Sequence, residues 1–264
     1  MTASAPTRPG IKLHLKQAML AIQFMTRVPL PALDVTAADF QAAIRWFPLA
    51  GLVVGSAVAL AFMLGSLISP WLAALAGVAA WVWVTGALHL DGLGDLVDGL
   101  AASHGDPDKL RAVMKDPHIG SLGVSALVLQ LLAKTILLHE AALLHEVALA
   151  SNPRPSLLLA VLLIPALVRV GPLLWTLWLP PLHAGLGSTF RAAASPLCLA
   201  LWAFGLLMPA LFIAPALWAT VGLLVLWGFW LKRKLGGVSG DCHGAGIELC
   251  ETGLLLALII PGAL

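Results

Sequence analysis

The sequence predicts an all-α, polytopic integral membrane protein with about seven transmembrane helices and an N-terminal interfacial helix. Three observations support this fold class. Of the 264 residues, 60% are hydrophobic and only 11% are charged, whereas a soluble domain carries about 25% charged residues. The apolar residues gather in runs of about 20, the length that crosses a bilayer as a helix. These runs do not alternate between apolar and polar residues, which favours helices over the strands of a membrane barrel.

A single membrane domain is expected to fill the whole chain, 1–264. It begins with 12–31, KLHLKQAMLAIQFMTRVPLP, whose mixture of basic and apolar residues is typical of an amphipathic helix on the membrane surface. Pro29 and Pro31 are expected to end this helix. The transmembrane helical bundle is then predicted over 46–263.

Seven apolar runs are candidates for membrane spans. They cover 46–68, 70–90, 119–145, 156–179, 195–213, 215–231 and 245–263. The sixth run is short for a span. The seventh contains two glutamates, so a tilted or re-entrant segment is the alternative there.

Lysine and arginine gather on the cytoplasmic side of membrane proteins. Twelve of them lie in four segments, against one, Arg154, in the opposite loops. The four segments are the region before residue 46, 91–118, 180–194 and 232–244. This pattern predicts that the N-terminus and the two acidic segments at 89–99 and 235–251 face the cytoplasm, and, with seven spans, that the C-terminus lies outside.

The charge and the cysteines limit the partners. A net charge of +2 gives no general affinity for nucleic acid, and the apolar composition makes the lipid bilayer an expected partner. The three cysteines show neither metal-ligand spacing nor a disulfide framework.

The segment HLDGLGDLVDG, residues 89–99, concentrates negative charge at a predicted membrane border. Asp91, Asp95 and Asp98 have i, i+4, i+7 spacing, which places them on one stripe of a helix over a rise of about 10 Å. Carboxylates so close repel each other unless a cation lies among them. Their hard oxygens suit Mg²⁺, Mn²⁺ or Ca²⁺, and Mg²⁺ is usually shared with a substrate phosphate. The alternative is a solvated acidic turn at a helix end.

His89 stands at the head of this segment. It is a candidate general base or metal ligand. The alternative is an ordinary histidine at a helix end.

A second acidic segment, LGGVSGDCHGAGIELCE, places Asp241 after a glycine-rich turn and Glu248 seven residues later on the same helix face. Gly240 and the neighbouring glycines are expected to form a flexible loop that approaches a ligand closely. The alternative is an ordinary loop in which Asp241 caps the next helix. Because both acidic segments are predicted on one side of the membrane, they can meet in space.

Positive charge would complete a phosphate site. In HGDPDKLRAVMKDPHIG, Asp106 is a predicted N-cap with Pro107 at the first helical position. Arg111 and Lys115, four residues apart, then project together. They are candidates to bind phosphate, and the alternative is the basic face of an interfacial helix.

Lys134 and Arg169 lie within apolar runs. A charge at membrane depth is rare and faces a cavity or a partner. Each is therefore expected either to reach a substrate phosphate or to form a structural ion pair with an acid.

Several of these segments together resemble a known family. LHLDGLGDLVDGLAASHGDPDKLRAVMKDPHIGSLGV resembles the central signature of the cobalamin synthase family, the adenosylcobinamide-GDP ribazoletransferases. AIQFMTRVPLP resembles its start, RWFPLAGLVVG its first span, and LGGVSGDCHGAGIEL its late GGxxGDxxGAxxE loop. The resemblance runs from residue 21 to about 251 in the family's order. Cys242 and His243 in the late loop depart from it mildly.

The resemblance implies a reaction in which α-ribazole, or its 5′-phosphate, joins adenosylcobinamide-GDP. Adenosylcobalamin or its 5′-phosphate forms and GMP leaves, which makes the enzyme a transferase of substituted phosphate groups. The resemblance also implies Mg²⁺ as the cofactor and a place in the bacterial cytoplasmic (inner) membrane, with the active site facing the cytoplasm. A homo-oligomer, or an association with other late cobalamin-pathway enzymes, is a further expectation about partners.

Combined with the resemblance, the residues suggest roles. Metal ligation, with one or two Mg²⁺ over the pyrophosphate, is expected from Asp91, Asp95, Asp98 and Asp241. One carboxylate, such as Asp98, would accept the hydroxyl proton, and His89 is a further catalytic candidate. Substrate binding is expected from Arg111, Lys115, Lys134, Arg169, Gly240 and Glu248.

Two rival functions are less well supported. A CDP-alcohol phosphotransferase would show AR shortly after the DG of its acidic motif, and this chain does not. A cation-coupled transporter would show inverted repeats and acids near the bilayer midplane. Here the acids gather at one end of the predicted spans.

Overall fold

The computed structural model describes residues 10–114, 116–151, 156–183 and 185–260, and the regular structure of these ranges is helical apart from one isolated bridge between Pro181 and Val238. The α-helices are α1 Ile11–Met25, α2 Ala37–Ala42, α3 Phe47–Ser66, α4 Pro70–Thr85, α5 Leu88–Ser103, α6 Pro107–Val113, α7 Ser121–Ser151, α8 Ser156–Val168, α9 Gly171–Trp178, α10 Leu186–Thr189, α11 Pro196–Ile213, α12 Ala219–Lys234 and α13 Gly240–Ile259. Three short 3₁₀ helices are η1 Ala43–Trp46, η2 Phe190–Ala192 and η3 Pro215–Trp218. The all-α prediction is confirmed.

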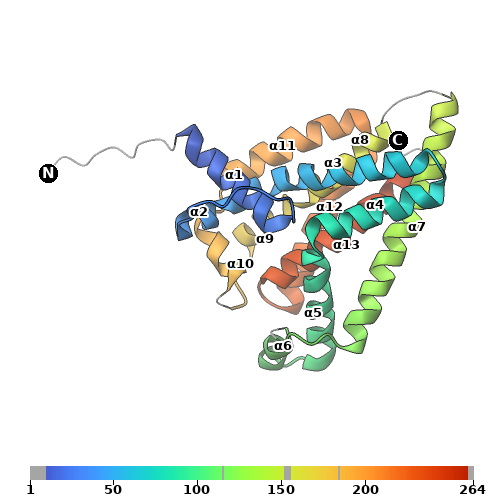
Figure 1. Cartoon of the computed structure of the whole chain (residues 1–264). Coiled ribbons are helices and arrows are strands. Elements are labelled where there is room, and N and C mark those ends of the chain that lie inside the picture. The colour runs from blue at the N-terminus through green and yellow to red at the C-terminus, as the bar shows by residue number, and fades with distance from the viewer. Residues whose placement is uncertain (1–9, 115, 152–155, 184, 261–264) are drawn as a thin grey trace.

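Small residues allow the apolar helices to pack closely. α3 lies between α4 and α8, and α8 also contacts α11 (Figure 1). A Cβ atom added at Gly55 would lie 1.9 Å from the carbonyl oxygen of Leu162, and one at Gly51 would lie 2.5 Å from the Cα of Ala166. Such contacts are typical of membrane helices, which associate by close packing because lipid supplies no hydrophobic drive between them.

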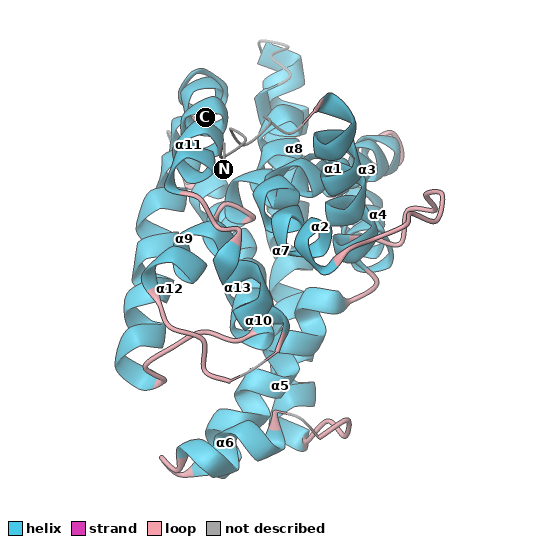
Figure 2. Cartoon of the chain, turned by 90° about the vertical axis from the view of Figure 1, so that its left-hand side faces the viewer, coloured by secondary structure: helices cyan, strands magenta, loops and turns pink. Residues whose placement is uncertain are grey.

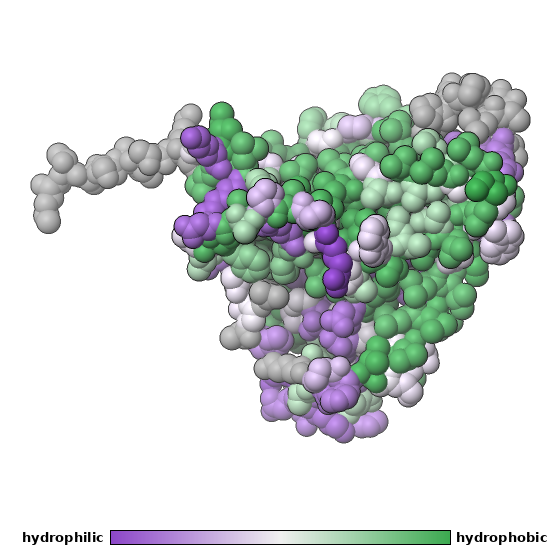
Figure 3. All heavy atoms as spheres, in the orientation of Figure 1, coloured by the Kyte–Doolittle hydropathy of each residue, from purple (hydrophilic) through white to green (hydrophobic). Residues whose placement is uncertain are grey.

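The outer surface of the bundle is apolar. Six helices of the described ranges are long and apolar enough to cross a membrane, and the pair α4 and α5, bent by 85°, raises the number to seven if it forms one broken span. On α7, Leu129 and Leu132 are more than half exposed. Figure 3 shows apolar residues over the upper and right-hand part of the molecule and polar residues over its left and lower ends. The chain is a polytopic membrane protein, as predicted.

Several predicted boundaries were wrong. The span 70–90 ends at Thr85, because Gly86 and Ala87 both take left-handed conformations with φ of 61°. By contrast, the predicted span 156–179 is confirmed as one apolar candidate span, Leu157–Trp178, within which a turn at Arg169 and Val170 separates α8 from α9. The last helix begins at Gly240, five residues before the predicted 245.

The N-terminal helix is also shorter than predicted. It ends at Met25, well before Pro29, because the chain turns into an extended segment at Thr26. The hydroxyl of Thr26 donates to the carbonyl oxygen of Ile22 at 2.7 Å, and the Arg27 N–H donates to the carbonyl oxygen of Val84 at 2.7 Å. The end of α1 is thereby tied to the end of α4.

The segments predicted to share one side of the membrane lie together. The end of α5, α6, α10 and the start of α13 gather at one end of the molecule (Figures 1 and 2). The backbone N–H of Leu182 donates to the carbonyl oxygen of Val238 at 3.0 Å, and the N–H of Val238 donates to Pro180 at 2.9 Å. These bonds join the 180–194 and 232–244 loops, which the distribution of basic residues had grouped.

Candidate functional site

The acidic stripe lies on α5, directly after a sharp corner. Gly86 caps α4, and a Cβ atom there would lie 2.2 Å from the Nε of Arg27, so only glycine fits both the space and the left-handed backbone. α5 then runs without a break through Asp91, Asp95 and Asp98. Their predicted helical spacing is confirmed.

The start of α13 lies against α5. A Cβ atom at Gly92 would lie 2.9 Å from the Asp241 Cα, and one at Gly244 would lie 3.1 Å from the His89 carbonyl oxygen. Glycines on both helices therefore bring the two backbones together. The two acidic segments, far apart in sequence, meet here as predicted.

Gly236 and Gly237 lie in a loop, as predicted, but from Gly240 onward the glycine-rich segment is helical, which contradicts a loop that extends to Glu248. Ser239, not Asp241, is the N-cap of α13, since its hydroxyl accepts from the Cys242 N–H at 3.2 Å. Asp241 lies in the first helical turn, and the Ser239 hydroxyl donates to its carboxylate at 3.3 Å. The glycines serve helix packing here, because α13 could not approach α5 with larger side chains.

Asp98 differs from the other acids of the stripe. Its carboxylate accepts the backbone N–H groups of Gly120 at 2.7 Å and Gly123 at 2.8 Å. These groups belong to the start of α7, so Asp98 caps that helix from a neighbouring one. Within the described part of the chain, the carboxylates of Asp91 and Asp95 form neither a hydrogen bond nor an ion pair.

The acids interact electrostatically across the two helices. Asp95 lies within range of like-charge repulsion from Asp91, Asp98 and Asp241. No three histidine, cysteine, aspartate or glutamate side chains of the described ranges are close enough to form a ready-made metal site. The described carboxylates are therefore neighbours across two helices and do not form a closed protein cage.

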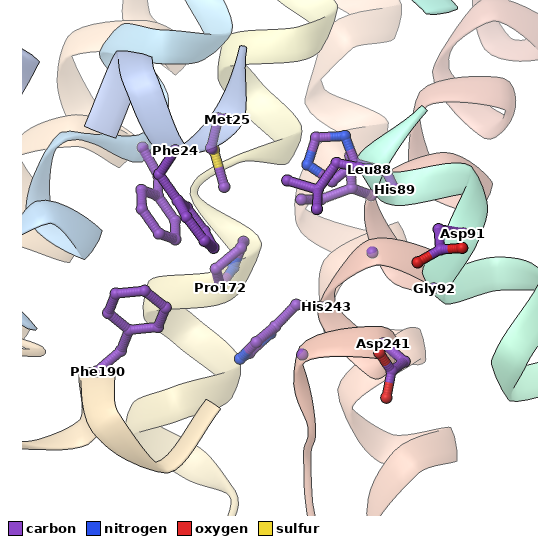
Figure 4. A pocket seen from close by; sticks show the side chains of 14 residues that line it. Phe24, Met25, Leu88, His89, Asp91, Gly92, Pro172, Phe190, Asp241 and His243 are labelled. Carbon is purple, nitrogen blue, oxygen red and sulfur yellow. The ribbon is translucent and has the colours of Figure 1, made fainter. Parts of the chain in front are cut away.

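A cavity of about 230 Å³, here called the central cavity, opens beside these acids. Its residues are Phe24, Met25, Phe47, Leu88, His89, Asp91, Gly92, Pro172, Phe190, Gly240, Asp241, His243, Gly244 and Ile247. Figure 4 shows Phe24 and Phe190 on one side of it and the carboxylates of Asp91 and Asp241 on the other. The cavity thus has an apolar aromatic side and an acidic side.

Arg27 is the cation that sequence reasoning missed. It lines a neighbouring cavity, the corner cavity, together with Phe24, Leu88 and Asp91, which also line the central cavity. Arg27 belongs to AIQFMTRVPLP, one of the segments that resembles the cobalamin synthase family. That resemblance is the sequence feature that could have identified Arg27 as a candidate site residue.

Lys134 is buried in an ion-pair network in the described core. Its ammonium group lies 2.7 Å from a carboxylate oxygen of Glu248 and 2.7 Å from one of Glu251. The Gln130 amide also donates to Glu248 at 2.9 Å, and the ammonium group lies 4.3 Å from the ring centre of Trp81. Of the two predicted environments for Lys134, the structure shows the ion pair with acids.

Arg169 extends this network to the central cavity. Fully buried, it donates to Glu251 at 2.9 Å and to the carbonyl oxygen of Pro165 at 2.9 Å. Its other terminal nitrogen lies 3.3 Å from Nδ1 of His89. Because a guanidinium group only donates, Nδ1 accepts and the proton of the neutral His89 ring is on Nε2.

The predicted basic helix lies elsewhere. Asp106 caps α6, as expected, by accepting the N–H groups of Asp108 and Lys109. Arg111 pairs with Asp108 and lines a separate cavity at the junction of α6 with Lys234, here called the α6 cavity. Lys115 lies outside the described residues.

The predicted residues thus divide into groups. Four line the central cavity, namely His89, Asp91, Gly240 and Asp241. Three belong to the buried network, namely Lys134, Arg169 and Glu248. The lining residues that the sequence did not single out include Phe24, Phe47 and Phe190, because they come from elements far apart in the chain.

A polytopic membrane protein with an acidic site at one end of its helical bundle is the class that the fold and the site define. The family model described as Cobalamin-5-phosphate synthase matches residues 17–259. This chain belongs to the cobalamin-5-phosphate synthase family.

Three similar relatives carry the name adenosylcobinamide-GDP ribazoletransferase. One from Novosphingobium aromaticivorans is 50% identical over 248 residues, which cover 92% of this chain and 96% of the relative. One from Thiobacillus denitrificans is 48% identical, with 92% and 94% covered, and one from Escherichia coli is 35% identical, with 90% and 97% covered. No solved structure matches the chain.

Proposed function

We propose that this protein is an adenosylcobinamide-GDP ribazoletransferase. It joins α-ribazole, or α-ribazole 5′-phosphate, to adenosylcobinamide-GDP and releases GMP. The observation that carries the proposal is the meeting of α5 and α13, where Asp91 and Asp241 border one cavity and Asp95 lies nearby. Relatives with this activity in their name match almost the whole chain.

The reaction is a transfer of a substituted phosphate group. A ribose hydroxyl oxygen bonds to the phosphorus attached to cobinamide, while the bond from that phosphorus to the bridging oxygen breaks. GMP leaves with the bridging oxygen, and a carboxylate accepts the hydroxyl proton. We assign this proton to Asp91, because Asp91 borders the central cavity and its carboxylate has no hydrogen-bond or ion-pair partner among the described residues. Asp98 is less suited, since two backbone N–H groups already occupy its carboxylate.

The donor set fits a divalent cation shared with substrate. Asp91, Asp95 and Asp241 offer hard carboxylate oxygens, and repulsion among them favours a positive ligand. Mg²⁺ is commonly held by one or two carboxylates plus substrate phosphates, which agrees with the lack of a closed cluster in the described residues. When bound, it would offset negative charge on the phosphate oxygens.

Cationic side chains have two different roles in this proposal. Arg27 shares the corner cavity with Asp91 and is suited to pair with a phosphate oxygen. Lys134 and Arg169 are already neutralised by Glu248 and Glu251. We therefore assign these two to holding α7, α8 and α13 together and to orienting His89.

The site is proposed to face the cytoplasm from the inner membrane. The support is the gathering of the basic segments at the end of the molecule that carries the acids (Figures 1 and 3). Single cysteines at Gly105 and Gly237, in a cysteine-free background, should be protected in intact cells from a reagent that does not cross the membrane. Labelling of both from outside would overturn this orientation. Association with itself or with other pathway enzymes stays a prediction.

The activity itself is tested with purified protein in detergent. Adenosylcobinamide-GDP, α-ribazole and Mg²⁺ should give GMP and adenosylcobalamin in equal amounts. A chelator should stop the release of GMP, and added Mg²⁺ should restore it. Asp108→Asn, on the exposed surface of α6, is the matched control for changes at Asp91. Formation of no GMP by well-folded protein would refute the proposal.

A further inference from the structure

The aromatic side of the central cavity has no part in the phosphate chemistry described so far. Phe24, Phe47 and Phe190 form a cluster in which ring centres lie 5.8 Å (Phe24–Phe47), 5.7 Å (Phe24–Phe190) and 5.2 Å (Phe47–Phe190) apart. They come from α1, α3 and η2, and Met25 and Pro172 complete the apolar lining. Three parts of the chain thus supply an apolar wall at a distance in sequence from the acids.

Two buried imidazoles border the same cavity. His89 is 3% exposed and His243 is 7% exposed. Nε2 of His89 and Nδ1 of His243 have no hydrogen-bond partner among the described residues. Buried polar nitrogens are nearly always paired in folded proteins, so the unpaired Nε2 of His89 beside this cavity points to a ligand that accepts a hydrogen bond from it.

We propose that the central cavity binds the base of the acceptor nucleoside, a flat methylated benzimidazole with one unprotonated ring nitrogen. In this arrangement the base lies against the phenylalanine rings, and the Nε2–H of His89 donates to its ring nitrogen. Figure 4 shows Phe24, Phe190 and His89 among the side chains that line this cavity. The inference rests on the proposed function and adds to it the place of one substrate and the group that recognises it.

The chemistry of the lining favours this base over the other ring systems of the reaction. A guanine presents several donors and acceptors, which an apolar lining would leave unpaired at a cost of about 1–3 kcal/mol each. A corrin ring is far larger than a cavity of about 230 Å³ can enclose, since pockets for drug-sized ligands measure roughly 300–1,000 Å³. A methylated benzimidazole needs apolar contact for its ring system and one hydrogen-bond donor for its ring nitrogen, and the aromatic side of the cavity and His89 offer these.

The position of Asp91 and Asp241 explains how a base bound in the central cavity would be placed for the reaction. Asp91 and Asp241 border the cavity on the side away from Phe190 (Figure 4). A base held by the aromatic side therefore directs its ribose toward the carboxylates, where the attacking hydroxyl loses its proton.

The buried ion-pair network determines which nitrogen of His89 carries the proton and donates to a ligand. Glu251 holds Arg169 at 2.9 Å, and Arg169 donates to Nδ1 of His89. His89 can therefore offer only Nε2–H to a ligand, and it has no free nitrogen to act as a proton acceptor. This makes His89 a binding residue, with Arg169 and Glu251 as positioning residues.

The first test separates the two substrates by steady-state kinetics. Phe190→Leu should raise the KM for α-ribazole about tenfold or more and change the KM for adenosylcobinamide-GDP less than twofold. Phe204→Leu, whose ring is 68% exposed on the outer surface of α11, is the matched control and should change neither. A rise in the KM for adenosylcobinamide-GDP alone would overturn the proposal, because the cavity would then hold the other substrate.

The second test asks whether His89 recognises the ring nitrogen. An indole ribonucleoside, which has carbon in place of that nitrogen, should react about tenfold less efficiently than the benzimidazole ribonucleoside with the unaltered protein. With His89→Phe the two nucleosides should differ less than twofold, whatever the remaining activity. An undiminished tenfold difference in the variant would contradict the role of His89.

Calorimetry separates this inference from the proposed function. Titration of the unaltered protein with 5,6-dimethylbenzimidazole, without any corrinoid, should show binding that Phe190→Leu weakens about tenfold. Binding without any release of GMP would refute the proposed function and leave the site standing. Release of GMP with no difference between the two proteins in either assay would refute the site and leave the function standing.

Discussion

The acids of α13 fall into two groups with opposite surroundings. Glu248 and Glu251 are buried, and each lies within 2.9 Å of a lysine or arginine nitrogen. Asp241, two helical turns earlier, borders the central cavity close to Asp91 and Asp95, which form no ion pair in the described chain. The comparison separates charge that the protein neutralises for itself from charge left for a ligand to neutralise. A buried charge is costly unless it is paired, so the paired group serves structure and the unpaired group is suited to chemistry.

The largest effect is expected from the unpaired group. Asp91→Asn should lower GMP release by at least about 100-fold, the order of loss when one group that stabilises a transition state is removed. Thermal unfolding of the variant in detergent should match that of the unaltered protein, because no described side chain depends on this carboxylate. Near-normal release of GMP at low Mg²⁺ would remove Asp91 from the mechanism.

Substitutions among the paired acids, Glu248 and Glu251, should lower the stability of the fold. Glu251→Gln leaves Arg169 without its carboxylate partner and Lys134 with only Glu248. Breaking a buried pair in this way costs about 3–5 kcal/mol, which thermal unfolding would register as a marked fall in Tm. Glu140→Gln, whose side chain is 48% exposed, is the control and should leave Tm nearly unchanged. Equal Tm values for the two variants would mean that the network contributes little to stability.

Asp98 lies between the two groups, since it is on the acidic stripe but bonded to α7. Asp98→Ala should destabilise the protein by about 0.5–2 kcal/mol, the usual cost of losing a helix cap. Its activity should fall less than that of Asp91→Asn. A 100-fold loss of activity with unchanged stability would restore Asp98 to the metal-binding role that the stripe predicts.

The smallest effects are expected for the cations. Arg27→Gln should lower GMP release about tenfold by removing one charge-assisted bond to phosphate. Arg111→Gln should change stability by less than about 1 kcal/mol, because partly exposed ion pairs contribute little, and activity less than threefold. A larger loss of GMP release for Arg111→Gln than for Arg27→Gln would indicate that the substrate phosphates bind in the α6 cavity instead.

Local patterns allowed much of this structure to be predicted. The apolar runs gave the helices, and the i, i+4, i+7 spacing gave the stripe on α5, because both depend on periodicity within one segment. The corner at Gly86 and Ala87 was missed, because a left-handed alanine has no clear sequence signal. The start of α13 was missed because its glycines were interpreted as a loop, although glycine also permits close helix packing in membranes.

Contacts between distant segments marked the limit of prediction. An ion pair was one of two environments expected for Lys134 and Arg169, but nothing in the sequence selected Glu248 and Glu251 as their partners. The aromatic side of the central cavity was not expected at all. Its phenylalanines lie on three elements and become neighbours only when α1, α3 and η2 pack together.

The corner between α4 and α5 also makes the direction of the aspartates on α5 independent of the length of α4 in the membrane. In one continuous helix, each inserted residue would rotate everything beyond it by about 100°. Here α5 begins as a new helix after the corner, and the backbone N–H of Arg27 donates to the carbonyl oxygen of Val84 beside that corner. The direction of α5 is set by its contact with α13 at Gly92. Residues can therefore be inserted into or deleted from the membrane-embedded part of α4, to match bilayers of different thickness, without a change in the direction in which the aspartates point.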